Sequence, residues 1–79
     1  MATTQEHDQI IAGNVRAEIA RANIGSAAII DLFGFSKDSL SRRMRGQTPW
    51  SASEIKKLEH FMLIPENTLT KIPTETPEN

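Results

Sequence analysis

The sequence predicts an all-α fold, and three features of its 79 residues lead to this prediction. Apolar residues recur every three or four positions, the spacing that places them on one face of a helix. Residues that start or end helices divide these stretches into five short helices. The chain has no cysteine, so neither a disulfide nor a thiolate metal site can stabilise it. A compact packing of helices is then the simplest way for so short a chain to bury a core.

The first predicted helix covers residues 8–22. Ile11, Val15 and Ile19 recur every four residues on one face, and Asp8 is the predicted N-cap. Residues 1–7 are polar and are predicted to be a flexible start, without the basic and apolar regions of a signal peptide.

The second and third predicted helices cover residues 26–33 and 36–45, and a tight turn joins them. Gly34 ends the second helix, because glycine adopts the left-handed conformation most easily, and Ser36 caps the third. Only Leu40 and Met44 are apolar on the third helix. One narrow stripe of this helix therefore faces the core, and the rest is left for solvent or a partner.

The fourth predicted helix starts at a capping box made by Ser51 and Glu54, just after Trp50, which is expected to pack over the third and fourth helices. A fifth short helix is predicted from Pro65 to Leu69. The domain is expected to cover residues 8–72, and the Pro, Thr and Glu content of residues 73–79 predicts a disordered tail.

Charge is distributed unevenly along the chain. The net charge is −1 with a pI near 6.1, which taken alone argues against a nucleic-acid partner. Residues 37–45, however, hold four bases and one acid, 4 − 1 = +3, and the remainder holds five bases and nine acids, 5 − 9 = −4. A basic segment on an acidic body indicates a directed electrostatic surface.

The segment from Gly34 to Gly46 carries a recognisable motif. A glycine is followed by Phe35-Ser36, then by Leu40-Ser41 four positions later, then by a second glycine. This pattern resembles the recognition helix of the lambda-repressor-like family, which includes phage repressors, Cro proteins and related bacterial regulators. The resemblance extends over about residues 10–70. It implies a compact five-helix domain that reads operator DNA with its third helix.

The resemblance also implies contacts, residue by residue. Base edges in the major groove are expected to meet Lys37, Asp38, Arg42 and Thr48. Phosphates are expected to meet Ser26, Ser41, Arg43 and Arg45. Three of these assignments have open alternatives: Asp38 as a helix-dipole residue, Ser26 as an ordinary first-turn residue, and Ser41 as a small spacer.

Four positions depart from the family pattern. Arg43 stands where many members bury an apolar residue, so Met44 is expected to take that role. Ser26 stands where members usually have a phosphate-binding Gln, and Ile30 stands where they have a small Ala, which predicts looser or shifted helix packing there. Leu63 stands where a Gly is expected after the fourth helix.

The predicted function is therefore a sequence-specific regulator of transcription, a repressor or Cro-like protein of a phage or bacterium, acting in the cytoplasm as a homodimer on double-stranded DNA. The alternatives are an antitoxin and an antirepressor-like module that binds protein instead of DNA. The sequence contains no nucleophile, metal-ligand or phosphate-loop motif, so no enzyme, cofactor, metal, small-molecule substrate or membrane partner is expected.

Overall fold

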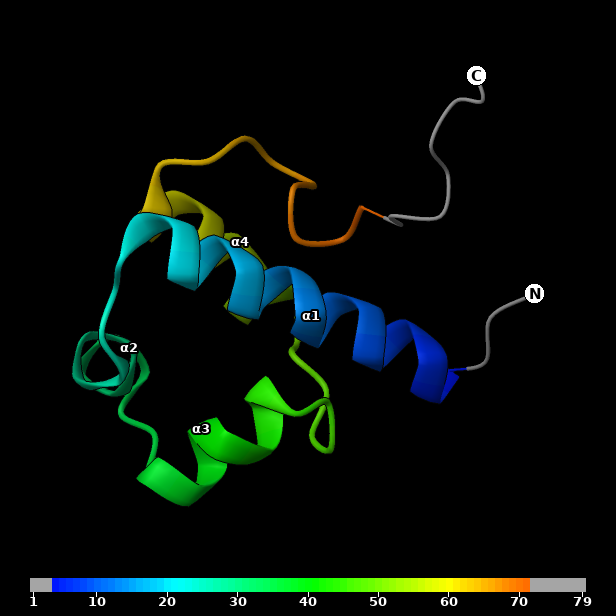
Figure 1. The fold of residues 1–79 in the computed structure, drawn as a ribbon, viewed down its shortest axis with the longest axis horizontal. Helices are drawn as coiled ribbons and strands as arrows, with labels where there is room; N and C mark the ends of the chain where they lie inside the picture. Colours follow the sequence, from blue (N-terminus) through cyan, green and yellow to red (C-terminus); the bar gives the residue numbers. More distant parts are fainter. Residues whose placement is uncertain (1–3, 72–79) are drawn as a thin grey trace.

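The computed structural model of the protein describes residues 4–71, with side chains from Glu6 onward. Figure 1 shows its four helices in chain order: α1 (Thr4–Ala22), α2 (Ser26–Phe33), α3 (Lys37–Met44) and α4 (Ala52–Met62). No strand occurs within residues 4–71, so the all-α prediction is confirmed for this part of the chain. The predicted count of five helices is wrong.

The first helix begins earlier than predicted. α1 starts at Thr4, so Asp8 lies inside it and is not the N-cap, and residues 4–7 are helical. Gln and Glu are good helix formers, and Glu6 lies in the first turn, where a carboxylate stabilises the positive end of the helix dipole. Residues 1–3 of the predicted flexible start, and the predicted tail at 73–79, lie outside the described residues.

The segment predicted as a fifth helix forms a series of turns instead. Its backbone groups bond to side chains of other helices: Asn14 donates to the carbonyl oxygens of Leu69 at 2.9 Å and Lys71 at 2.7 Å, and the carboxylate of Glu59 accepts from the Leu69 amide at 3.1 Å. Asn67 has a φ of 72°, which no α-helix permits. Long-range contacts therefore replace the local helical bonds that the sequence favoured.

All four helices contribute side chains to one core. It contains Ile11, Val15 and Ile19 of α1, as their spacing predicted, together with Ile29, Leu40, Trp50, Ile55, Leu58 and Leu69. The predicted burial of Trp50 is confirmed.

The caps predicted for the other helices are confirmed at Gly34, Ser36 and Ser51. Gly34 closes α2 with a φ of 76°, and the Ser36 hydroxyl accepts from the Ser39 amide at 3.1 Å at the start of α3. Ser51 and Glu54 form both bonds of the capping box of α4. Leu63, at the position where a glycine was expected, adopts the left-handed conformation nonetheless, with a φ of 58°.

Candidate functional site

α3 is held at its C-terminal end by two polar side chains of α1. Gln9 donates from Nε2 to the Arg45 carbonyl at 2.9 Å, and the Arg16 guanidinium donates to the Met44 carbonyl. The last carbonyls of a helix have no partner within the helix, so these two bonds satisfy them and fix the end of α3 against α1. Gly46 follows in a left-handed conformation and lies so close to Gln9 that a side chain there would collide with the Gln9 carboxamide.

One face of α3, which we call the inner face, is formed by Leu40, Arg43 and Met44. Leu40 is buried, with 4% of its surface exposed. The Arg43 guanidinium lies 3.4 Å from the Glu54 carboxylate of α4 and donates to the Ser39 hydroxyl at 2.5 Å. These contacts hold Arg43 inside the fold, where its side chain is only 17% exposed.

A stack of aromatic and cationic groups connects α3 to α4 through the α2–α3 turn. The rings of Phe33 and Phe35 are parallel within 8° at 4.8 Å, and the Arg43 guanidinium lies 4.1 Å from the centre of the Phe35 ring. On the other side the Lys57 ammonium of α4 lies 5.3 Å from the Phe33 ring. Trp50 is tilted against both rings and donates to the Arg43 carbonyl at 3.1 Å. Cation–π and ring contacts of this kind fix the turn, and with it the direction of α3.

The exposed side of α3, which we call the outer face, is polar: it consists of Lys37, Asp38, Ser41, Arg42 and Arg45 at the C-cap. Arg42 and Asp38 form an ion pair at 3.1 Å, with 57% and 70% of their side chains exposed. A pair this exposed is weak, so both side chains can exchange it for another partner. With Arg43 turned inward, the outer face keeps three bases and one acid, 3 − 1 = +2.

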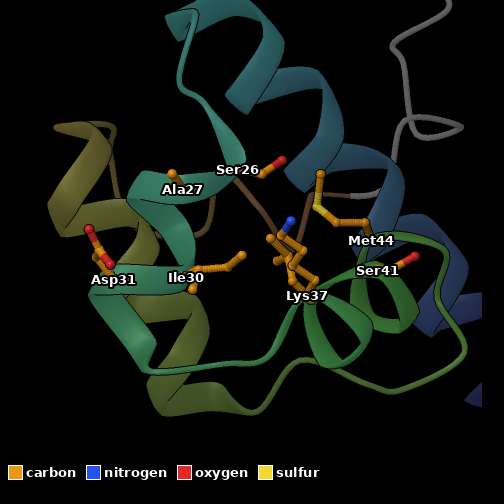
Figure 2. Close-up of a pocket in the computed structure, with 8 residues that line it drawn as sticks. Ser26, Ala27, Ile30, Asp31, Lys37, Ser41 and Met44 are labelled. Carbon is orange, nitrogen blue, oxygen red and sulfur yellow. The ribbon is translucent and has the colours of Figure 1, made fainter.

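The structure brings most of the predicted site residues together. Five of the eight form the outer face, and Ser26, in the first turn of α2, lines the same groove as Lys37 and Ser41 (Figure 2). Thr48 is half-buried in the loop after α3, where its amide donates to the Arg42 carbonyl at 3.3 Å. Arg43 is the exception, because Glu54, Ser39 and Phe35 engage its guanidinium.

The sequence interpretation missed the residues that hold α3 in place. Arg16 bonds to the end of α3, while Arg21 pairs with Glu18 within α1. Gln9 and Arg16 are two helical turns apart and so share one face of α1, a spacing that could have indicated a common partner. Within residues 4–71 no group of three His, Cys, Asp or Glu side chains is arranged to bind a metal ion. None of the described helices is both long and apolar enough to cross a bilayer.

Comparison with protein-family models places residues 6–76 in the BetR domain family, and because the match covers most of the chain, the protein belongs to that family. Comparisons with curated proteins and with solved structures gave no match.

Proposed function

We propose that the protein is a DNA-binding regulator of transcription in which α2 and α3 act as a helix-turn-helix of the lambda-repressor-like type. The observation that carries the proposal is the division of α3 into two faces. The inner face is fixed to α1 and α4. The outer face presents exposed cations whose side chains do not hold α3 to another helix.

The dimensions of α3 suit the major groove of DNA. An α-helix with its side chains is about 10–12 Å in diameter, and the major groove of B-DNA is about 12 Å wide. A recognition helix must also be rigid, because a helix that rotates cannot keep its donors aligned with base edges. The anchors at Gln9 and Arg16 and the stack on Phe35 supply this rigidity.

The outer face is then assigned as follows. Arg42 and Lys37 donate to guanine, and Asp38 either accepts from cytosine or orients Arg42 through their ion pair. Ser26, Ser41 and Arg45 bind phosphates and fix the register of the protein on the duplex. Arg43 receives no phosphate in this proposal, since its guanidinium is engaged by Glu54 and Ser39.

A recognition helix this short reads only a few base pairs, so a specific operator requires two copies of the protein. On that basis we propose a homodimer on two half-sites about one helical turn of DNA apart, or about 34 Å. We propose further that the protein acts in the cytoplasm and has no catalytic activity.

The experiment is a titration of labelled random-sequence duplex at several salt concentrations between about 50 and 200 mM. We expect measurable binding. The logarithm of the association constant should fall linearly with the logarithm of the salt concentration, because cations of the outer face displace counterions from phosphates. Arg45→Ala should weaken binding to the random duplex, because Arg45 is assigned to phosphate, while Lys56→Ala, an exposed lysine of α4, serves as the matched control. A protein that folds but binds no duplex at the lowest salt would favour the protein-binding module. Co-purification with a small toxin would identify an antitoxin.

A further inference from the structure

An open groove of about 700 Å³ lies between α2 and α3 (Figure 2). Its lining is apolar along both helices and polar at the rim: Ala27, Ile30, Leu40 and Met44 form the apolar part, and Ser26, Asp31, Lys37 and Ser41 the polar part. Grooves that bind small organic molecules have volumes of about 300–1,000 Å³ and the same combination of apolar walls with few polar groups.

The groove stays open because the large side chains of the α2–α3 turn point elsewhere. Phe33 and Phe35 stack on each other and on Trp50, towards α4. The groove side is left with small residues such as Ser26, Ala27 and Ser41, which cannot fill the space between two helices that diverge from the turn. Ile30, which stands where a small residue is usual, lines the groove from α2.

One cation points into this groove. Figure 2 shows the Lys37 side chain reaching from α3 towards Ser26 and Met44, with Asp31 on the far lip of α2. Arg42 and Arg43 have acidic partners in Asp38 and Glu54, but the Lys37 side chain makes no hydrogen bond or ion pair among residues 4–71. Lys37 is exposed and lies beside the apolar walls of the groove, so its ammonium is available to pair with an anion there.

We propose that this groove binds a small carboxylate with an apolar body, such as a single aromatic ring on a short chain. The carboxylate pairs with Lys37 and accepts from the hydroxyl of Ser26 or Ser41, and the apolar body lies on Ile30 and Met44. A neutral apolar molecule would leave the ammonium without a partner, and a cation would be repelled by it.

Such a ligand regulates DNA binding, a consequence that rests on the proposed function. Lys37, Ser26 and Ser41 line the groove and belong to the proposed DNA contacts. A bound carboxylate therefore withdraws Lys37 from base edges and places a negative charge next to phosphates, so ligand and DNA compete.

The direct test uses 4-phenylbutyrate as the probe and 4-phenylbutanol as its neutral counterpart, with the folded protein observed by methyl NMR. We expect saturable shifts at the methyl groups of Ile30, Leu40 and Met44, and none at Leu58 in the core or Leu63 at the end of α4. The alcohol should bind at least about tenfold more weakly, since one lost charge-assisted contact corresponds to about that factor. Lys37→Met keeps the apolar stem and removes the charge, and should cause the same loss. Lys56→Met, on α4, should bind the acid as the unmodified protein does.

Equal affinity for acid and alcohol, unchanged affinity in Lys37→Met, or no saturable shift at the three methyl-bearing residues would overturn the carboxylate site. Competition is tested separately with random-sequence duplex at constant ionic strength. A ligand at ten times its dissociation constant should raise the apparent Kd for DNA about elevenfold if the two exclude each other. Carboxylate binding without this rise would overturn the regulatory step alone. Carboxylate binding by a protein that binds no duplex would refute the proposed function and leave the groove site standing.

Discussion

Arg42 and Arg43 are neighbours in the sequence, yet the two faces of α3 give them different environments. Arg42 lies on the outer face, where a weak ion pair with Asp38 leaves it exposed. Arg43 lies on the inner face, in contact with Glu54 of α4, with the Ser39 hydroxyl and with the ring of Phe35. Successive residues of a helix are rotated by about 100°, which is enough to turn one cation to solvent and the next to the core.

The comparison shows that a local count of bases overestimates a charged surface. Residues 37–45 carry +3 in the sequence, but one of their four cations is a structural residue. What the outer face offers to a partner is the smaller charge that remains, on a helix whose other side is fixed.

The largest expected effect lies at the centre of the inner face. Leu40→Ala should lower the free energy of unfolding by about 2–5 kcal/mol, because it removes buried methyl groups and leaves a cavity between α3 and the core. Urea denaturation followed by circular dichroism measures this loss. Ser41→Ala, the neighbouring exposed position, should change the same quantity by less than about 0.5 kcal/mol. Similar losses in both variants would refute the division of α3 into two faces.

The turn that sets the direction of α3 should be the next most sensitive position. Gly34→Val should cost about 2 kcal/mol, because a β-branched residue is strongly disfavoured at a φ of 76°. Leu63→Gly is the complementary variant, since Leu63 is left-handed and 88% exposed and loses little burial on truncation. It should be neutral or stabilising by up to about 1 kcal/mol. A tolerated valine at residue 34 would mean that the turn does not depend on the left-handed conformation.

Substitution of the neighbouring arginines, Arg42 and Arg43, should lower the free energy of unfolding by smaller and unequal amounts. Arg43→Ala should cost about 1–2 kcal/mol, since it removes charge-assisted hydrogen bonds and the contact with Phe35, whereas Arg42→Ala should cost less than about 0.5 kcal/mol. Arg43→Ala should also change the fluorescence of Trp50, the single tryptophan, because it removes the guanidinium from the Phe35 ring against which Trp50 packs. Equal stability of the two variants, with unchanged fluorescence in both, would contradict the inward role of Arg43.

These differences mark the limit of what the sequence could predict. The caps at Gly34, Ser36 and Ser51 depend on neighbours within a few residues, so local patterns were sufficient to identify them. The pairing of Arg43 with Glu54 joins two helices across a loop, and the anchors from Gln9 and Arg16 to α3 span 36 and 28 residues. No local pattern encodes such contacts.

Long-range contacts also explain why the predicted fifth helix does not form. Pro65 suits the first turn of a helix, and the local sequence supported one there. In the structure Asn14 and Glu59 take the backbone groups of Leu69, whose side chain is buried in the core. Burial and distant hydrogen bonds override local helix propensity in this segment.

The measurement that tests the central claim most directly is DNA binding by Arg42→Ala and Arg45→Ala. Both variants are titrated with a duplex selected from a random library by the unmodified protein and with a random duplex, at several salt concentrations, and circular dichroism verifies their helix content. Arg42→Ala should lose about 1–3 kcal/mol on the selected duplex and little on the random one, because it reads a base edge. Arg45→Ala should weaken both duplexes alike and reduce the slope of log affinity against log salt by about 0.9. If both folded variants bound both duplexes as the unmodified protein does, the outer face of α3 would not be the DNA-reading surface.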